Sequence, residues 1–269
     1  MTIELVDDLA LARTIAAMAD LISMRRFEAH DFTVSTKPDR TPVTEADREV
    51  EKAIREAILA ARPGDAILGE EFGSTGHQEG EHRPHRQWII DPIDGTANFL
   101  RGVPIWGTLI ALAIDGVPVV GVASAPALGQ RWWAAKGHGA YTQRAGKHEE
   151  KISVSKVSKL TDAVVSYNSL PGWFEVGRGD QAIELAKTAW RARAIGDLWA
   201  YMLLAEGAID VSTECGLQSY DMAALVPIVE EAGGRFTDID GREGPWHGTA
   251  LATNGLLHEA TLEMLSEND

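Results

Sequence analysis

The N-terminal part of the chain carries two helical patterns of apolar residues. Apolar positions recur every three to four residues over 3–29, which predicts an amphipathic helix. The same spacing from 44 to about 61 predicts a second helix, which the Arg-Pro-Gly sequence at 62–64 ends. The residues between the two patterns, 35–42, are polar and predict a connector.

Beyond these helices the pattern changes to short apolar runs. Runs between 105 and 141 alternate with turn residues, which predicts an antiparallel meander. In the second half, strand-like and helix-like runs alternate, which is typical of a layered α/β fold with mixed sheets flanked by helices. The other predicted strands are 66–68, 88–90, 163–166, 192–195, 208–211, 235–238 and 250–253. The later helices are predicted at 180–189, 198–206, 222–232 and 256–265.

Two polar stretches interrupt these patterns. Residues 74–86 predict an exposed loop, and its histidines, His77, His82 and His85, match no strong zinc spacing. The basic, glycine-containing stretch 143–151 indicates a lobe boundary. We therefore expect an N-terminal α/β lobe at 1–145 and a C-terminal α/β lobe at 146–269, packed as one compact unit. The patterns show no internal repeat.

Composition narrows the possible partners. The 269 residues carry 25 Lys and Arg against 40 Asp and Glu, a formal net charge of −15. This balance argues against nucleic acid and against an anionic membrane surface as partners. Acids near the N-terminus are unlike a secretory signal, and no apolar run approaches 18 residues, so we expect a soluble, cytoplasmic protein. The single cysteine, Cys215, excludes an intrachain disulfide and suits a reducing compartment.

The most informative acids follow the predicted strand at 88–90. Asp91 and Asp94 are three residues apart, with Pro92 between them and the bend-permitting Gly95 and the hydroxyl of Thr96 directly after. Carboxylates and hydroxyls are the hard oxygen ligands that Mg²⁺ prefers. The backbone after Gly95 is placed to open a short helix whose N–H groups face a phosphate. A capped turn also explains these residues if they are taken alone.

Three further segments place acids at element ends. Glu70 follows the predicted strand at 66–68, where a charged turn is the alternative explanation, one that suits Glu71 better than Glu70. Asp221 stands at the mouth of the predicted helix 222–232, where it fits a helix N-cap. Thr44 with Asp47 resembles a capping box at the start of the second helix. Each site has a local explanation, so only their combination points to a metal centre.

Together, in order and over nearly the whole chain, these segments resemble the inositol monophosphatase family of metal-dependent phosphatases. The matching segments are Lys37, 43–47, Gly-Glu-Glu at 69–71, Asp-Pro-Ile-Asp-Gly-Thr-Ala-Asn-Phe at 91–99, Arg-x-x-Gly at 193–196 and Asp221-x-Ala-Ala. The resemblance implies an αβαβα sandwich, a homodimer, lithium sensitivity, and two or three Mg²⁺ ions per active site. The substrate class that it implies is a small-molecule phosphomonoester.

Carried over residue by residue, the resemblance also implies roles. One Mg²⁺ would be held by Glu70, Asp91, the Ile93 carbonyl and Thr96, a second by Asp91, Asp94 and Asp221, and a weaker third near Glu70. Thr96, with Asp47, would take part in activating the attacking water, together with Glu70. The N–H groups of Gly95 and Thr96 would bind phosphate oxygens. Because the motif is Asp-x-x-Asp at 91 and not Asp-x-Asp near the N-terminus, we expect no phosphoenzyme.

The leaving group is recognised elsewhere in the chain. The candidate residues are Arg193, Gly196, Asp197, Glu214 and, from the metal cluster, Asp94 and Asp221. Two extra carboxylates, Asp197 and Glu214, suit a cationic alcohol, because each contact with an ammonium would be charge-assisted. This pattern resembles the histidinol-phosphate phosphatases of the family, which act in histidine biosynthesis.

Several alternatives stay open from the sequence. Inositol 1-phosphate, or a broad set of small phosphomonoesters, would also suit the family. A metal- or phosphate-binding regulator without turnover is a third possibility. At the residue level, Asp197 also fits the N-cap of the helix 198–206, and Glu214 also fits a solvated loop acid.

Overall fold

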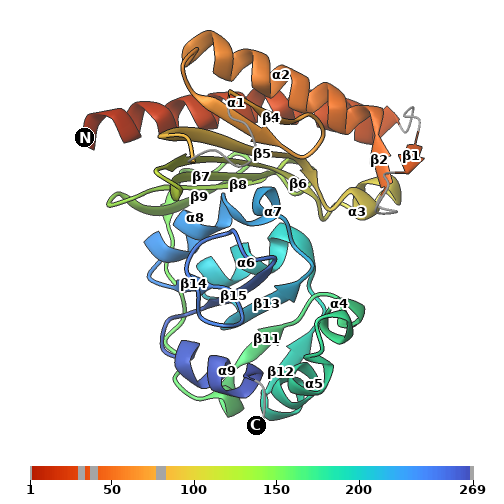
Figure 1. The fold of residues 1–269 in the computed structure, drawn as a ribbon, viewed down its shortest axis with the longest axis vertical. Coiled ribbons are helices and arrows are strands. Elements are labelled where there is room, and N and C mark those ends of the chain that lie inside the picture. Colours follow the sequence, from red (N-terminus) through yellow and green to blue (C-terminus); the bar gives the residue numbers. More distant parts are fainter. Residues whose placement is uncertain (1, 30–33, 37–41, 77–82, 267–269) are drawn as a thin grey trace.

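The protein is built of five alternating layers of helix and sheet (Figure 1). A computed structural model describes residues 2–29, 34–36, 42–76 and 83–266. Within these ranges, an eight-stranded sheet and a five-stranded sheet are separated and covered by helices, so the chain forms the predicted αβαβα sandwich. Lys37, His77 and His82 lie outside the described residues.

The larger sheet collects strands from the first half of the chain. Its order is β10-β9-β8-β7-β6-β5-β3-β4, and only the β3–β5 pair is parallel. Its strands are β3 (Ala66–Gly69), β4 (Gly73–Thr75), β5 (Arg86–Asp94), β6 (Gly107–Ile114), β7 (Val117–Ala125), β8 (Gln130–Ala135), β9 (Gly139–Arg144) and β10 (Glu150–Lys151). Strands β6 to β9 form the expected antiparallel meander, and β5 extends it by pairing antiparallel with β6.

The smaller sheet and the helices come mostly from the second half. Its order is β12-β11-β13-β15-β14, with β11 parallel to both neighbours. Its strands are β11 (Val164–Ser166), β12 (Arg191–Arg193), β13 (Val211–Cys215), β14 (Arg235–Thr237) and β15 (Thr249–Thr253). A separate pair joins β1 (Val34–Thr36) and β2 (Pro42–Thr44). The helices are α1 (Thr2–Ala29), α2 (Glu45–Ala61), α3 (Thr96–Leu100), α4 (Leu170–Glu175), α5 (Gly179–Thr188), α6 (Asp197–Ala205), α7 (Ser219–Met222), α8 (Leu225–Glu231) and α9 (His258–Leu265).

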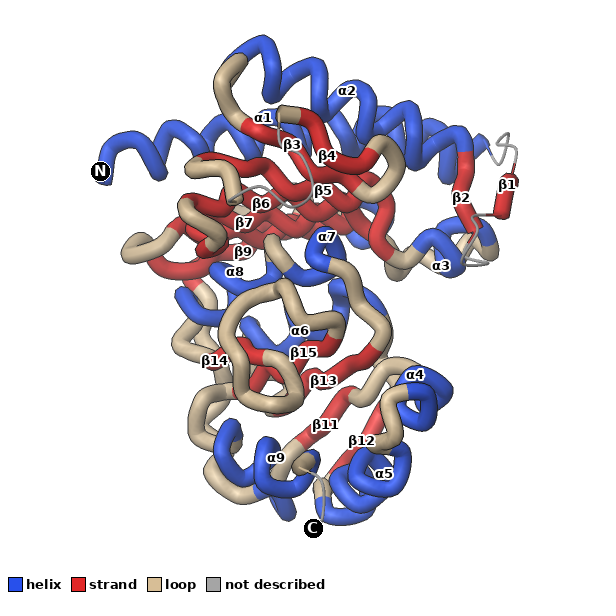
Figure 2. The backbone as a smooth tube through the Cα atoms, in the orientation of Figure 1, coloured by secondary structure: helices blue, strands red, loops and turns tan. Residues whose placement is uncertain are grey.

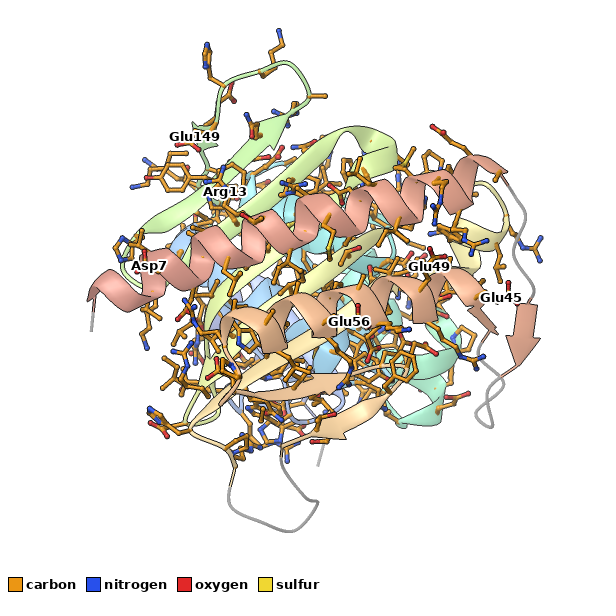
Figure 3. The ribbon with its side chains drawn as sticks, turned by 90° about the horizontal axis from the view of Figure 1, so that it is seen from above. Asp7, Arg13, Glu45, Glu49, Glu56 and Glu149 are labelled. Atoms are coloured by element: carbon orange, nitrogen blue, oxygen red, sulfur yellow. The ribbon has the colours of Figure 1, made fainter. Side chains whose placement is uncertain are left out.

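The two predicted N-terminal helices cover one face of the larger sheet. Figure 3 shows α1 and α2 side by side across this face, with the acidic residues Glu45, Glu49 and Glu56 along α2. Ile54 on α2 and Trp88 on β5 are fully buried in the apolar layer between these helices and the sheet. The apolar stripe that predicted the helices is therefore the surface that holds them on the sheet.

The middle layer of α6 and α8 lies between the two sheets (Figure 2). The adjacent residues Trp132 and Trp133 on β8 point to opposite faces of the larger sheet, as alternation along a strand requires. Trp132 packs into the core with α6 and α8, and Trp133 packs into the core with α1. On the far side of the smaller sheet, α5 and α9 form the outer layer.

Three predicted elements differ from the structure. Strand β5 does not end at Asp91 but continues to Asp94 through an irregularity in its pairing with β6, where Pro92, which has no N–H to donate, is tolerated. The strand predicted at 208–211 is β13 (Val211–Cys215), so Glu214 lies in a strand and pairs with Ala250. Tertiary pairing with β15 overrides the polar local sequence.

The helix predicted at 222–232 is also divided, into α7 and α8. Pro227 in α8 has no N–H to donate to the carbonyl of Ala223, and its ring crowds that carbonyl, so a continuous helix is disfavoured at this point. In the meander, a Cβ on Gly121 would collide with the carbonyl of Ala224. The α7–α8 junction therefore packs directly on the backbone of β7.

Two polar stretches also form more structure than predicted. Residues 73–75 of the expected loop form β4, and Arg86 begins β5. Residues 143–151 contain the end of β9 and all of β10, which pair with each other in the larger sheet. The lobe boundary that we predict after residue 145 falls inside this hairpin. Among the described residues, no helix has the length and apolarity needed to cross a membrane.

Candidate active site

The site begins where two parallel strands of the larger sheet end side by side. Gly69 at the end of β3 pairs with Ile90 of β5, and the N–H of Glu70 donates to the Ile90 carbonyl at 3.2 Å. Glu70 and Asp91, each one residue further along, therefore leave the same edge of the sheet. The strand pairing thus brings together two acids that are 21 positions apart in the sequence.

A buried ion pair from α2 supports the turn that carries Glu70. The Glu51 carboxylate is fully buried and accepts hydrogen bonds from the N–H groups of Glu71 at 2.7 Å and Phe72 at 3.2 Å. Arg55 binds Glu51 through Nε at 2.7 Å. A Cβ on Gly69 would collide with the Glu51 carboxylate, which explains the glycine before the two glutamates.

The end of β5 leads into a short helix, as expected. Gly95 has φ +80°, a left-handed conformation that glycine adopts without strain, and it is the N-cap of α3. A Cβ at this position would lie 3.1 Å from the Ile105 carbonyl oxygen. The Thr96 hydroxyl donates to the Ile93 carbonyl at 3.0 Å, so these two oxygens face the same point.

Asp47 joins the site through Thr96. The Thr44 hydroxyl accepts hydrogen bonds from the N–H groups of Ala46 and Asp47, and one Asp47 oxygen, Oδ2, accepts from the Thr44 N–H and hydroxyl at 2.7 and 2.6 Å. The other oxygen, Oδ1, accepts from the Thr96 hydroxyl at 3.4 Å. Asp47 therefore forms the predicted capping box and also reaches the site. Burial raises its pKa to about 6.

Asp221 comes from the middle layer and completes a carboxylate cluster. It is the third residue of α7, and its Oδ2 accepts from the N–H of Gln218, the N-cap, at 2.6 Å. Asp221 is therefore not itself the N-cap. One carboxylate oxygen from each of Asp91, Asp94 and Asp221 lies within 4.8 Å of the others.

The electrostatics of this cluster fit a bound cation. Burial raises the pKa of Asp91 well above its ordinary value, and repulsion from Glu70, Asp94 and Asp221 raises it further. The pKa of Asp94 is raised in the same way, by burial and then by Asp197. The Asp91 Oδ1 atom is buried and receives no hydrogen bond from the described residues. Hard carboxylate oxygens held this close together suit a divalent cation, so the residues present fit the expected metal site.

These groups open into a cavity of about 240 Å³. Its polar lining combines the expected metal-site acids with two carboxylates of the C-terminal half, Asp197 and Glu214. The lining residues are Glu70, Asp91, Ile93, Asp94, Gly95, Thr96, Ala97, Asp197, Leu198, Tyr201, Glu214, Leu217, Asp221 and Leu225. The larger sheet, the middle helices and the smaller sheet therefore all contribute to one cavity.

Glu214 is a partly buried strand residue with a donor on each oxygen. Asn168 Nδ2 donates to Oε1, and the Tyr201 hydroxyl donates to Oε2 at 3.5 Å. Burial raises the pKa of Glu214 to about 8, and repulsion from Asp197 and Asp221 adds to the shift. A solvated loop acid does not describe this residue, because β13 and its pairing with β15 bury it at the cavity wall.

Asp197 also faces the cavity, and it is not an N-cap. The N-cap of α6 is Gly196. The N–H of Leu198, in the first turn of this helix, donates to Asp94 Oδ2 at 2.7 Å. The Asp197 side chain instead accepts from Asn98 Nδ2 at 2.7 Å. Asp197 has φ +54°, which an L-residue with a side chain rarely adopts, so its position is constrained by its surroundings.

Other predicted residues lie outside the cavity lining. Arg193 is exposed on β12, and its Nη1 donates to the neighbouring Ala192 carbonyl at 2.8 Å. Gly196 lines a neighbouring cavity of about 450 Å³, which shares Asp197 with the first. Asp47 reaches the site only through Thr96. His85, the histidine of the loop that is described, is exposed and contacts Asp115 at 2.8 Å.

The sequence analysis missed three polar residues around the cavity: Asn98, Asn168 and Tyr201. Asn98 stands inside the motif at 91–99, so its place in that motif was enough to suggest that it lies near the site. Tyr201 is one helical turn after Asp197 on α6, which places both on one face of that helix. Asn168 follows β11 in a stretch with no recognisable pattern, and only the tertiary structure places it beside Glu214.

Comparisons with known proteins agree with this geometry. The inositol monophosphatase family model matches residues 5–269. The chain is 52% identical to a histidinol-phosphatase of Mycobacterium tuberculosis, over 97% of this chain and 98% of that protein. It is 51% identical to a histidinol-phosphatase of Streptomyces coelicolor, over 97% of both. The structure of an inositol monophosphatase from Zymomonas mobilis matches with a TM-score of 0.83 and 34% identity, over 96% of this chain and 97% of that one. The protein therefore belongs to the inositol monophosphatase family of metal-dependent phosphatases and is a phosphoric monoester hydrolase.

Proposed function

We propose that this protein hydrolyses L-histidinol phosphate to L-histidinol and phosphate, a step of histidine biosynthesis. The observation that carries the proposal is the pair of carboxylates, Asp197 and Glu214, that line the cavity beyond the metal cluster. Histidinol bears an amine and an imidazole, and carboxylates form charge-assisted hydrogen bonds with such groups. Two relatives above 50% identity that are named histidinol-phosphatase support the same substrate.

We propose Mg²⁺ as the metal, with two or three ions per site. Glu70, Asp91, the Ile93 carbonyl and Thr96 would hold one ion, and Asp91, Asp94 and Asp221 a second, with a weaker third near Glu70. The chemistry that such ions supply is activation of a water molecule and neutralisation of phosphoryl charge. Glu70 lines the cavity beside Asp91, so it is placed to position the attacking water.

The chain's own residues provide a route for a proton and a cradle for the phosphate. The Thr96 hydroxyl lies between Ile93 and Asp47, so it accepts a hydrogen bond from the attacking water while donating its own proton to Asp47. Asp47, whose pKa is about 6, then holds that proton transiently. The N–H groups of Gly95 and Thr96 stand at the N-cap and first residue of α3, where helix geometry supplies no intrahelical acceptor, and they are proposed to bind phosphate oxygens. No side chain is proposed as a nucleophile, so no phosphoenzyme should accumulate.

The direct test is release of inorganic phosphate from a small panel of substrates. The panel contains histidinol phosphate, inositol 1-phosphate and an adenosine bisphosphate, each with Mg²⁺ and with EDTA. We expect the highest kcat/KM for histidinol phosphate and no turnover with EDTA. Equal or higher kcat/KM for inositol 1-phosphate would replace the proposal by the second candidate, an inositol-1-monophosphatase. Relatives with that name, at 33% identity, favour this candidate next.

Several properties follow from family membership alone and are proposed on that basis. They are a homodimer and inhibition by lithium, which are tested by light scattering and by activity assays with LiCl. A cytoplasmic location is proposed from the composition and is tested by fractionation. The two-lobe division at residue 145 stays a prediction. A regulator without turnover is set aside, because the chain is a phosphoric monoester hydrolase that retains Glu70, Asp91, Asp94, Thr96 and Asp221.

A further inference from the structure

The second cavity has an unassigned asparagine in its wall. Asn168 lines the cavity of about 450 Å³ together with Asp197 and Gly196, while its carboxamide Nδ2 reaches Glu214 in the wall of the first cavity. Asn168 therefore stands between the two carboxylates to which the proposed function assigns the leaving group. Within the part of the chain that the structure describes, the carboxamide of Asn168 donates to Glu214 and not to Asp91, Asp94 or Asp221.

The backbone holds Asn168 in this place. The Ser166 hydroxyl donates to the Ile195 carbonyl at 2.6 Å, and the Tyr167 N–H donates to the Arg193 carbonyl at 3.3 Å. The indole N–H of buried Trp173 donates to the Tyr167 carbonyl at 3.0 Å. The chain on both sides of the Tyr167 peptide is thus tied to neighbouring elements immediately before Asn168.

The conformation of Asn168 also indicates a constrained position. Its φ is +49°, a left-handed conformation that costs free energy for a residue with a side chain, although asparagine tolerates it better than most. Such conformations persist where the surroundings require them, often next to binding sites. The hydrogen bonds on either side of the Tyr167 peptide are the surroundings that hold Asn168 in this conformation.

The two ends of the carboxamide meet different partners. Nδ2 donates to Glu214 Oε1, and Oδ1 lies 2.7 Å from the position that a Cβ on residue 196 would occupy. Gly196 leaves room for this oxygen, which gives a structural reason for the glycine of the Arg-x-x-Gly segment. Any side chain at 196 would displace the carboxamide, and with it the donor to Glu214.

Donors on both oxygens fix the plane of the Glu214 carboxylate. A carboxylate has about four lone-pair sites, so Asn168 and Tyr201 occupy two and leave the others for the cavity. We propose that Asn168 is a specificity-determining positioning residue, which orients Glu214 so that its remaining lone pairs receive the cationic part of the leaving alcohol. This inference rests on the proposed function, because it assigns that contact to a cationic alcohol.

The test distinguishes the effect of the Asn168 side chain from the effect of a glycine at a position with positive φ. Asn168→Gly removes the carboxamide and accepts a positive φ, and Asp115→Gly is the matched control, since Asp115 is exposed with φ +50°. We expect Asn168→Gly to raise KM for histidinol phosphate about tenfold with kcat within about twofold, as loss of one hydrogen bond to a charged group predicts. KM for inositol 1-phosphate should change by less than about twofold, because its alcohol carries no cation for Glu214 to receive.

A double-mutant cycle adds a readout that a merely structural residue would not move. In a Glu214→Gln background, Asn168→Gly should change KM for histidinol phosphate by less than about twofold, because the carboxylate that it orients is absent. Asn168→Asp, which keeps the size of the side chain but places two carboxylates together, should raise that KM at least as much as Asn168→Gly. The melting temperature of each variant shows whether it is folded.

The outcomes distinguish this inference from the proposed function. Equal KM increases for both substrates, or fully additive effects in the cycle, would overturn the role of Asn168 while a wild-type preference for histidinol phosphate stands. A wild-type enzyme that does not hydrolyse histidinol phosphate would overturn both. Unchanged KM in both Asn168 variants would also exclude the positioning role.

Discussion

Two carboxylates in the same cavity, buried Asp91 and partly buried Glu214, differ in the hydrogen bonds that they accept. Both have a raised pKa, and burial is the largest cause for each. Asp91 leaves a buried oxygen that receives no hydrogen bond from the described residues, whereas Glu214 has a protein donor on each oxygen. A carboxylate left without donors among other acids is stabilised by a cation, while one already held by amide and hydroxyl groups is oriented without a cation.

The difference divides the cavity by function. The acids at the ends of β3 and β5 repel one another, and their arrangement is explained by the positive charge that they would bind. The acids on α6 and β13 each accept a hydrogen bond from a neutral donor that brings no positive charge, so a cationic ligand would favour their ionised form. Four variants or conditions test this division, and they follow in order of expected effect.

The largest effect is expected for Asp91→Asn. The variant removes the carboxylate that both proposed ions share, so kcat/KM should fall by about 10³-fold, which corresponds to several kcal/mol of lost charge stabilisation. Added Mg²⁺ should no longer raise the melting temperature. Asp115→Asn, an exposed acid, is the control. Activity within tenfold of the wild type would contradict a metal role for Asp91.

Removal of the metal should make stability strongly dependent on pH. Burial raises the pKa of Asp47 to about 6 and that of Glu214 to about 8, so between the ordinary and the raised values the folded state binds more protons than the unfolded state. Stability of the metal-free protein should therefore fall as pH rises from about 5 to about 8. Mg²⁺ at a hundredfold excess over its Kd should add about 2.7 kcal/mol to the free energy of unfolding.

Thermal unfolding with EDTA and with Mg²⁺ at several pH values measures this effect. The increment from Mg²⁺ should be larger at pH 8 than at pH 5, because the cluster acids must lose their protons to bind the ion. Glu214→Gln should reduce the pH dependence without abolishing the response to Mg²⁺. A metal-free protein whose stability increases over this range would show that the pKa values of Asp47 and Glu214 are not raised in the folded state.

A smaller and more selective effect is expected for Asp197→Asn. The change keeps the shape but removes the charge facing the leaving group, so KM for histidinol phosphate should rise about tenfold. The response of the melting temperature to Mg²⁺ should be retained, unlike that of Asp91→Asn. Steady-state kinetics with an uncharged phosphomonoester supplies the comparison, and equal increases for both substrates would remove Asp197 from recognition of the cation.

The smallest effect is expected for Gly196→Ala. The new Cβ would lie 2.7 Å from Asn168 Oδ1, so the carboxamide must shift and KM for histidinol phosphate should rise about threefold, part of one hydrogen bond to a charged group. Gly64→Ala is the matched control, because a Cβ there meets no atom within 4 Å. An unaffected KM with an unchanged melting temperature would show that Asn168 tolerates the displacement.

The local sequence pattern was sufficient to predict the features whose residues lie in one contiguous segment. The block at 91–99 predicted two acids, Asp91 and Asp94, as candidate metal ligands, and the structure places both in one carboxylate cluster. The apolar period predicted α1 and α2, because a helix repeats its buried face every 3.6 residues. The capping box of Thr44 and Asp47 was also readable, since both partners lie within one helical turn. The sequence pattern did not predict the continuation of β5 to Asp94, because this continuation depends on pairing with β6.

The sequence by itself determined the family, the layered α/β class and the acids at the ends of β3 and β5. Only the tertiary structure decided that Asn168 reaches Glu214, 46 positions away, and that Arg193 points away from the cavity. The physical reason is that metal ligands are chosen by residue type in short segments. The orientation of a recognition carboxylate, by contrast, depends on donors that the packing of β11, β13 and α6 brings together.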